Sequence, residues 1–541
     1  MDASTRRPRR ARFGVVALVV AALGLAGGIA AALGDDNPQP IDFTHNINDA
    51  PAPVPGAVFG SGPAVKTGTA ICTTATQSSA NVTTDCEGAN NPHNETSIAV
   101  NPTNTQHMVG GANDYQLGLN PGGHVSESVL SRAHVTFDGG KTWSEFPIYS
   151  SSNYQGTGDP AVAFDATGRA YYATLGFRFV GPFNATNPDV QVSTSGDGGK
   201  TWSNTVVAAG SGVETSVGDL LDKEYIAAWG NGNAIITYGD FRLGHKGAFL
   251  ASTIHATVTH DGGKSWSAPQ TISGSLDQAF VSVPTVTANG RIYVAFLNTT
   301  DLATGRDDYE VVRVNPATGA AIGSPVKVAT AIDGATDYPI AFGRQTYERS
   351  AFRTWAAGNI TADPTNANHL AVVWSDMRNS TLPAPSDPFA ATTHTNSDIV
   401  VSQSFDAGST WSAPVAIAAA GDQFMPWGAY DAAGKLRIGY FDRSYDAANH
   451  LYGYTLATET TAGALAFGFA QVTTALSDPT LEDRWFSGGV TNHATSFLGD
   501  YSGIAIVPGG GVVALWTDLR NTACFTTRCG HGEDAYFAKL P

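Results

Sequence analysis

Apolar and polar residues alternate in short runs along most of the chain after about residue 90, and turns rich in Gly, Asp, Asn and Pro separate these runs. The apolar run 159–164, for example, is followed by the turn Asp165-Ala166-Thr167-Gly168 and by a second apolar run, 170–175. Short strands joined by tight turns have this pattern. No length of 12 or more residues downstream shows an amphipathic helical stripe. The pattern therefore predicts an all-β protein.

The same order of strands and turns recurs. Each unit has two strands joined by a turn, a loop of variable length, a third strand, a hairpin and a fourth strand. Seven units can be placed, and they start near Glu95, Asp159, Asp222, Ser282, Trp355, Met425 and Gly499.

Four of the hairpins share the motif [Ser/Thr]-x-Asp-x-Gly-x-[Ser/Thr]-Trp. Its Asp and Trp pairs are Asp138 and Trp143, Asp197 and Trp202, Asp261 and Trp266, and Asp406 and Trp411. We expect each carboxylate to accept hydrogen bonds from turn amides, because glycine next to it allows the tight turn. We expect each Trp to anchor its hairpin by burial.

The spacing of this motif sets the number of units. The first three copies are 59 and 64 residues apart (138 to 197 to 261), and the next gap is 145 residues (261 to 406), about two units. The unit without the motif, residues 282–328, falls in that gap. A fixed period of this length predicts a β-propeller of four-stranded antiparallel blades, closed by pairing of chain-terminal strands. Seven blades are favoured, and six would follow if one unit were an insertion or a shared closing blade.

The hairpin motif resembles the Asp-box, or BNR repeat, of sialidases and other Asp-box β-propellers. The resemblance implies a structural hairpin between the two outer strands of a blade, on the face away from the active site. Sialidases hold the substrate carboxylate with three arginines and use an acid/base Asp and a Tyr nucleophile with a Glu partner. The family's Arg-Ile-Pro motif is absent here, where the chain reads Asn94-Glu95-Thr96-Ser97-Ile98, and sialidases have six blades.

The first 34 residues have the pattern of an export signal. Five arginines within residues 6–12 precede the uncharged apolar run 13–34, which is long enough to span a bilayer. A cleaved signal peptide and an uncleaved transmembrane anchor both fit, and both place the rest of the chain outside the cytoplasm. Residues 35–90 are rich in Pro, Thr, Ser, Ala and Asn and predict a linker or arm, so the propeller is assigned to residues 91–541.

Composition narrows the possible partners. The chain has 30 basic and 47 acidic residues, a formal net charge of −17, which argues against nucleic acid or an anionic membrane surface. We expect a monomer that meets a glycan or glycoprotein surface. The even number of cysteines predicts disulfides in an exported chain; of three possible pairings the local one is simplest, Cys72 with Cys86 and Cys524 with Cys529. No histidine has zinc-ligand spacing to either pair.

Two further repeats indicate where chemistry could occur. Aromatic-x-Asp-x-Arg ends the second strand of three units, with the pairs Asp240 and Arg242, Asp376 and Arg378, and Asp518 and Arg520. An acid precedes the first strand of four units: Glu95, Asp159, Asp222 and Asp500. In a meandering blade these two positions lie at the same end, opposite to the hairpin motif. We therefore expect the acids to ring the mouth of the central channel, with the Asp-x-Arg residues outside them.

Both repeats admit a structural and a functional interpretation. The aspartates and arginines either pair within and between blades, which their repetition favours, or the three arginines bind one substrate carboxylate. In the second case Asp159 and Tyr501 are candidate catalytic residues, as is Glu348 in the insertion between the fourth and fifth units. The ring of acids is also a candidate Ca²⁺ site, since Ca²⁺ takes oxygen ligands.

Two functions follow from these features. One is a retaining, sialidase-like glycoside hydrolase that acts on sialylated or other acidic glycans and requires no cofactor for hydrolysis. The other is a non-catalytic extracellular scaffold, with Ca²⁺ as a possible structural ion, that binds a glycan or a protein.

Overall fold

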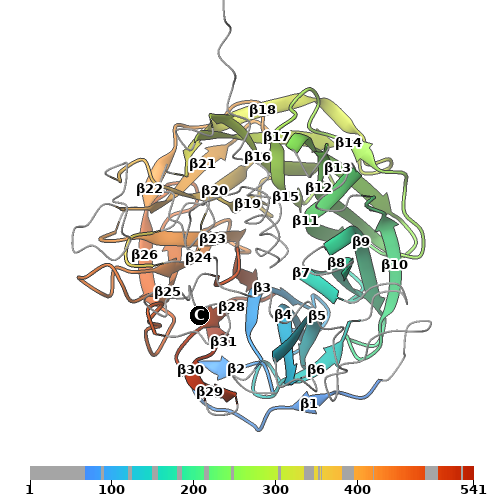
Figure 1. The fold of residues 1–541 in the computed structure, drawn as a ribbon. Coiled ribbons are helices and arrows are strands. Elements are labelled where there is room, and N and C mark those ends of the chain that lie inside the picture. Colours follow the sequence, from blue (N-terminus) through green and yellow to red (C-terminus); the bar gives the residue numbers. More distant parts are fainter. Residues whose placement is uncertain are drawn as a thin grey trace, which may run out of the picture.

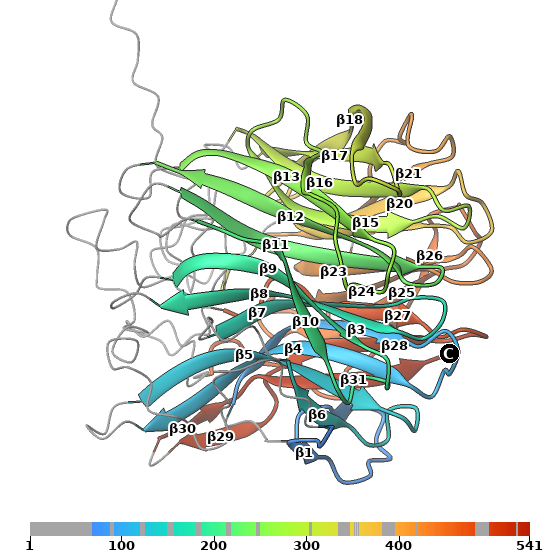
Figure 2. The same cartoon turned by 90° about the vertical axis from the view of Figure 1, so that its right-hand side faces the viewer.

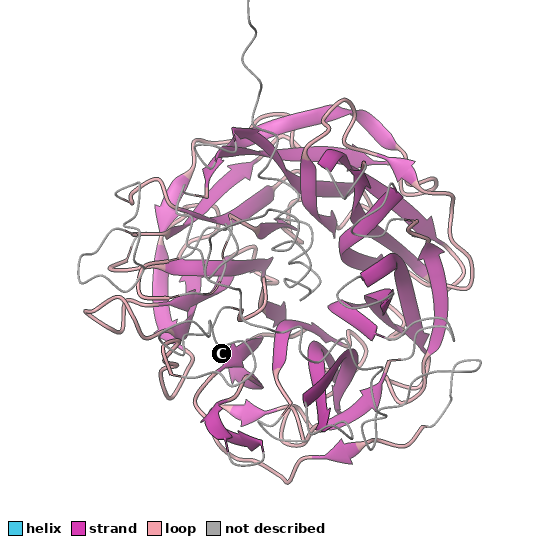
Figure 3. Cartoon of the chain, in the orientation of Figure 1, coloured by secondary structure: helices cyan, strands magenta, loops and turns pink. Residues whose placement is uncertain are grey.

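The computed structural model describes residues 68–86, 91–119, 125–148, 156–179, 185–211, 218–244, 249–301, 306–333, 347–350, 352, 354, 356–380, 395–417, 419–481, 497–525 and 528–541. The secondary structure of this part is entirely strands, turns and bends (Figure 3). It accordingly contains no helix long and apolar enough to cross a membrane. The apolar run 13–34 and most of the expected arm lie outside the described residues.

Seven four-stranded antiparallel sheets are arranged as blades around a common centre, and the first strand of each blade lies nearest that centre (Figure 1). The first three blades consist of β3 (His93–Val100), β4 (Met108–Leu119), β5 (Val125–Thr136) and β6 (Ser144–Pro147); β7 (Gly156–Phe164), β8 (Ala170–Phe179), β9 (Ala185–Ser195) and β10 (Ser203–Ala208); and β11 (Gly218–Trp229), β12 (Asn233–Leu243), β13 (Phe249–Thr259) and β14 (Gln270–Thr271).

The next three blades repeat the order. They consist of β15 (Ala279–Val286), β16 (Ile292–Asp301), β17 (Arg306–Val314) and β18 (Ala321–Ile332); β19 (Gly358–Ala362), β20 (Leu370–Asp376), β21 (Asp398–Ser404) and β22 (Val415–Ile417); and β23 (Gln423–Tyr430), β24 (Leu436–Asp442), β25 (Gly453–Glu459) and β26 (Phe467–Gln471). The prediction of a seven-bladed, all-β propeller is thus confirmed.

The seventh blade joins the two ends of the described chain. Its strands β27 (Gly503–Ile506), β28 (Val512–Asp518) and β31 (Asp534–Leu540) are completed by β2 (Val82–Thr83), which pairs antiparallel with β31. A short hairpin of β29 (Thr522–Phe525) and β30 (Arg528–His531) precedes β31, and β1 (Cys72–Thr73) adds a fifth strand to the first blade beside β6. Residues from the expected arm therefore close the ring.

The core consists of apolar layers between neighbouring blades. Val109 and Val135 of the first blade, for instance, share one buried cluster with Tyr172 and Trp202 of the second. Each sheet must cover both faces, so its strands alternate between two such layers and burial of apolar area on both sides stabilises the ring.

The four repeated hairpins have the local hydrogen bonds that their sequence predicts. In the first, Asp138 Oδ1 accepts from the backbone N–H groups of Lys141 and Thr142, both at 3.0 Å, and Oδ2 accepts from the Thr142 hydroxyl at 2.7 Å. Asp197, Asp261 and Asp406 accept the corresponding bonds. Trp143 and Trp202 are buried, whereas Trp266 and Trp411 are half-buried.

The hairpins lie at the same end of the propeller as the turns between first and second strands. In the third blade, for example, the N–H of Gly262 in the hairpin donates to the carbonyl of Gly232 in that turn, at 2.9 Å. The opposite end is formed by the starts of first strands and the ends of second strands. Figure 2 shows the blades from the side, with the two ends of the strands facing left and right.

Candidate functional site

β-Bulges in the innermost strands position the acidic residues at the strand-one end of the channel. The pairing register shifts between Asn94 and Ser97 in β3, between Gly158 and Ala161 in β7, and between Asp222 and Tyr225 in β11. Each bulge contains a residue with positive φ: Glu95 (53°), Asp159 (57°) and Lys223 (51°). A bulge re-aims the side chain that it carries, and such a backbone in non-glycine residues is characteristic of strained, specifically placed positions.

These side chains converge on one lysine. Lys223 Nζ lies 2.9 Å from Glu95 Oε1, 2.7 Å from Asp159 Oδ2 and 2.8 Å from Asp500 Oδ2. Asp222 and Glu224, its chain neighbours, are the other acids in this group. We call these six residues the central cluster; each is at most 2% exposed. Four blades therefore meet at one ammonium group.

The central cluster retains a positive lysine among carboxyl groups that resist ionisation. Burial raises the pKa of Glu95, of Asp222 and of Glu224 well above their usual ranges, and the charge of Asp159 adds to each increase. Burial alone would lower the pKa of Lys223, but the charges of Asp159, Asp500 and Glu95 outweigh it and raise that pKa. A protonated carboxyl group next to an ionised one is thus the expected state near neutral pH.

Aromatic rings lie beside the central cluster. Tyr225 of β11 stacks on Trp427 of β23 at 5.5 Å between ring centroids and contacts Tyr501 edge-on at 5.4 Å. Lys223 Nζ lies 5.6 Å from the centre of the Tyr501 ring. Tyr225 and Tyr501 are buried, whereas Trp427 is half-buried. Because blades three, six and seven contribute these rings, they pack across the central channel.

The structure brings together some of the sequence-predicted residues. Glu95, Asp159 and Asp500, three of the four expected calcium ligands, surround the Lys223 ammonium group, while Asp222 interacts with it through its charge. A protein cation thus lies where the sequence suggested an ion. Asp159 and Tyr501, two of the three candidate catalytic residues, also share this cluster, since the charge of Asp159 contributes to the raised pKa of Tyr501, after burial and Glu95.

The third candidate, Glu348, belongs to a different buried network. Its carbonyl accepts from Arg443 Nη1 at 2.8 Å, and its carboxylate accepts from Asn449 Nδ2 at 3.3 Å. Arg443 is fully buried and also pairs with Asp422 at 3.3 Å. These contacts attach residues 347–350 to the sixth blade.

The aromatic-x-Asp-x-Arg repeat forms internal hydrogen-bond units. Arg378 Nη2 lies 2.7 Å from Asp376 Oδ2, which also accepts from the Trp374 indole at 3.0 Å. Arg378 donates as well to the carbonyl of Thr330 in the fourth blade. The motif therefore fastens a blade to the one before it.

The seventh blade repeats this unit. Arg520 pairs with Asp518 at 2.6 Å, the Trp516 indole donates to Asp518 at 3.0 Å, and Arg520 also donates to Thr474 and Asn81.

The third copy differs. The side chain of Arg242 is exposed, and Asp240 lies 3.5 Å from His255 Nε2. Burial, with the charge of Asp219, raises the pKa of Asp240 to about 6. The guanidinium groups of Arg378 and Arg520 thus contact separate blades and do not share a ligand-binding position.

Sequence reasoning missed Lys223, Tyr225 and Trp427. A lysine inside the first strand of a unit, in a chain that uses few lysines, was the available signal. The convergence itself carries no such signal, because the partners are separated by 64 to more than 400 residues (Asp159, Glu95 and Asp500 against Lys223).

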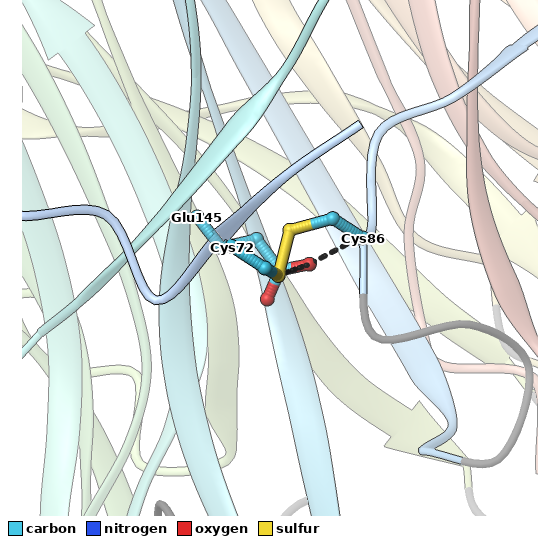
Figure 4. A group of neighbouring side chains, drawn as sticks. All are labelled: Cys72, Cys86 and Glu145. Atoms are coloured by element: carbon cyan, nitrogen blue, oxygen red, sulfur yellow. Dashed lines mark hydrogen bonds between the residues drawn. A yellow bond between two sulfur atoms is a disulfide. The ribbon is translucent and has the colours of Figure 1, made fainter. Parts of the chain in front are cut away.

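Of the expected disulfides, Cys72–Cys86 is present, with its sulfur atoms beside Glu145 (Figure 4). Cys524 and Cys529 are directly opposite each other in the β29–β30 hairpin, and their side chains lie outside the described part.

No protein-family model and no curated protein matches this sequence. Among solved structures, the chain is similar to the Hadza microbial sialidase Hz136 (11% identity, 77% of this chain, 75% of that chain, TM-score 0.40). It is also similar to a family PL25 ulvan lyase (11%, 71% and 81%, TM-score 0.43) and to the GH93 α-L-arabinofuranosidase of Fusarium graminearum (13%, 85% and 97%, TM-score 0.40).

Proposed function

We propose that the protein is an extracytoplasmic glycan-binding propeller, with its ligand face at the strand-one end of the central channel. The observation that carries this proposal is that the candidate catalytic groups are engaged in internal contacts. Asp159 pairs with Lys223 at 2.7 Å, and the Tyr501 hydroxyl donates to the carbonyl of Pro160 at 3.0 Å. Both side chains are buried, so they contribute to the ring more directly than to a reaction.

The half-buried Trp427 supports a sugar ligand. Its ring is held in place by stacking on Tyr225, and a fixed aromatic face suits the apolar C–H face of a sugar ring, while nearby polar groups orient hydroxyls. The net charge of −17 disfavours a strongly anionic ligand. A neutral glycan is therefore the expected ligand class.

Binding of the full chain to a panel of neutral and sialylated glycans tests this proposal. We expect binding to neutral glycans and no release from a fluorogenic sialoside at any pH between 4 and 8. Trp427→Ala should weaken binding by at least about tenfold, the loss of one well-packed aromatic contact. Trp411→Ala, at a half-buried tryptophan of a hairpin at the opposite end, is the matched control and should bind as the unchanged protein does. Equal binding by both variants would contradict the proposed ligand face.

The sialidase-like hydrolase is the second candidate, and one observation favours it. Tyr501, Glu95 and Asp159 lie in the same cluster, and sialidases use residues of these three types as nucleophile, partner and acid/base. Tyr501→Phe keeps the ring and removes the hydroxyl group. Sialoside release that this variant abolishes, at unchanged melting temperature, would establish the hydrolase and overturn the binding proposal.

A further inference from the structure

A second buried polar cluster lies where the first blade meets the closing strand β2. Its centre consists of His93 at the start of β3, His134 of β5 and Glu145 of β6, and all three side chains have no exposed surface. One ring nitrogen of each histidine and one oxygen of the carboxylate lie within 4.8 Å of one another. His134 and Glu145 are direct partners in the β5–β6 register, so sheet pairing fixes two of the three groups.

The hydrogen bonds of His134 leave one nitrogen directed at this centre. The Thr84 hydroxyl lies 2.7 Å from His134 Nδ1 and donates its single hydrogen to the Ala535 carbonyl at 3.2 Å. His134 Nδ1 must therefore carry the proton that the Thr84 oxygen accepts. Burial, with the charges of His93 and Arg132, lowers the pKa of His134 well below its usual value, so the ring is neutral. His134 Nε2 then has a lone pair, is buried and has no hydrogen-bond partner.

His93 has a similar arrangement. Its ring meets that of His134 edge-on at 5.5 Å between centroids, and neither of its nitrogens has a hydrogen-bond partner. His93 Nε2 lies 3.7 Å from Asp114 Oδ1, and Asp114 is held by Arg132 at 2.8 Å. A carboxylate behind one nitrogen of an imidazole is the usual outer support of a metal-binding histidine.

The charges around the centre favour a cation. Acidic groups outnumber the single buried Arg132, and they are Asp85, Asp114, Glu145, Glu533 and Asp534. Burial and the charge of Asp534 raise the pKa of Asp85 well above its usual range, as expected where negative charges crowd together without compensation. A bound cation would relieve this crowding.

We propose that His93, His134 and Glu145 bind one divalent transition-metal ion, with Zn²⁺ as the preferred ion. Two imidazole nitrogens and a carboxylate oxygen are a known zinc ligand set, whereas Ca²⁺ and Mg²⁺ prefer oxygen ligands alone. Cys72 and Cys86 lie beside Glu145 but form a disulfide (Figure 4), so they offer no thiolate. The disulfide instead holds the Cys86 N–H on Glu145 Oε1, which orients the carboxylate.

An adjoining cavity gives the ion a route to the site. This cavity has a volume of about 330 Å³ and is lined by Asp85, Cys86, Asn521 and Asp534, among others. Asp85 and Cys86 thus border both the cavity and the histidine–glutamate centre.

The first test uses the full chain, purified without chelator or reducing agent. Elemental analysis after Zn²⁺ equilibration and desalting should find one zinc per chain. At 100 times the dissociation constant, Zn²⁺ should raise the melting temperature by about 2–3 °C. Replacement by Co²⁺ should give the visible absorption of a four-coordinate cobalt site. Absence of retained zinc, together with an unchanged melting temperature, would overturn the proposal.

Variants assign the ligands. His93→Asn and Glu145→Gln should lose the zinc-induced temperature shift and the cobalt absorption. His369→Asn is the control: His369 is also buried, but it bonds to Asp363, Gln403 and Tyr430 in another part of the ring, so this variant should retain both signals. Wild-type stoichiometry in the first two variants would also refute the site, and if either variant fails to fold, the wild-type zinc and cobalt measurements still decide the question.

Discussion

Carboxylates perform opposite electrostatic roles in the repeated hairpins and in the central cluster. Asp261 of a hairpin is exposed, and hydrogen bonds from the Ser265 hydroxyl and backbone N–H lower its pKa to about 2. Glu95 of the central cluster is fully buried, and its pKa is raised. The donors to Asp261 lie within four residues of it, whereas the cation beside Glu95 is 128 residues away in the chain. The hairpins thus stabilise single turns, and the central cluster joins four blades.

The largest expected effect comes from removal of the central cation. Lys223→Met leaves Glu95, Asp159 and Asp500 buried without their partner, and we expect a loss of about 3–5 kcal/mol in the free energy of unfolding. Chemical denaturation measures it. Lys327→Met is the control, since that lysine is half-exposed in its pair with Asp308 and should cost under about 1 kcal/mol. A similar loss in both variants would remove the distinction between the two regions.

A glycine of the first hairpin tests whether these turns are purely local. Gly140 has a φ of 94°, and a Cβ atom there would overlap the ring of Phe537 in β31. Gly140→Ala should therefore cost about 2–4 kcal/mol, through backbone strain and overpacking combined. Gly290→Ala has a similar φ of 78° but open space around it, and should cost about 1 kcal/mol. Equal melting temperatures would show that the contact with Phe537 is unimportant.

A hairpin carboxylate should matter less. Asp197→Ala removes the acceptor for Thr201 N and Oγ1, at 2.9 and 2.6 Å, and should cost about 1–2 kcal/mol. Glycan binding should be unaffected, because the hairpin lies at the opposite end. Asp197→Asn retains an acceptor oxygen and is expected to recover part of the stability. Loss of binding at normal stability would place the hairpin in the ligand site.

The dependence of stability on pH should have two sides, each with a smaller effect. Burial raises the pKa of Asp189 to about 6, and burial with the charge of Asp308 raises that of Glu310 to about 7. Both lie above the unfolded values, so this stabilisation is complete below about pH 4 and is lost as the pH rises through 6 to 7. Asp261 has the opposite sign, and its contribution is lost as the pH falls from about 4 to 2.

Melting temperatures between pH 2 and 8 check this expectation. We expect a maximum in the mildly acidic range. Glu310→Gln should flatten the alkaline side, and Asp261→Asn should flatten the acid side. A monotonic rise up to pH 8 would contradict the raised pKa values.

The sequence predicted the features that depend on neighbouring residues. Strand alternation, the turn chemistry around Asp138 and the spacing of its repeats gave the seven blades, and the meander placed Glu95, Asp159, Asp222 and Asp500 at one end. It did not predict that Lys223 would lie among them, because the bulge that turns this lysine inward depends on the pairing of β11 with β12.

The arginine motif and the histidines show the same limit. Arg378 and Arg520 were open to two interpretations until their partners Thr330 and Thr474 in neighbouring blades were known. His93 and His134 have no metal-binding spacing in the sequence, since sheet pairing and ring closure bring them together.

The closing strand has a consequence for synthesis of the chain. Val82 pairs with Phe537, so the partner of β2 is made 455 residues later (537 against 82). At about 5–20 residues per second, that delay is roughly 20–90 s. Six blades can pair internally during this interval, yet the ring stays open at its seventh position. The lifetime of this open ring, rather than the pairing rate of any one blade, then sets how long unpaired sheet faces are exposed to aggregation.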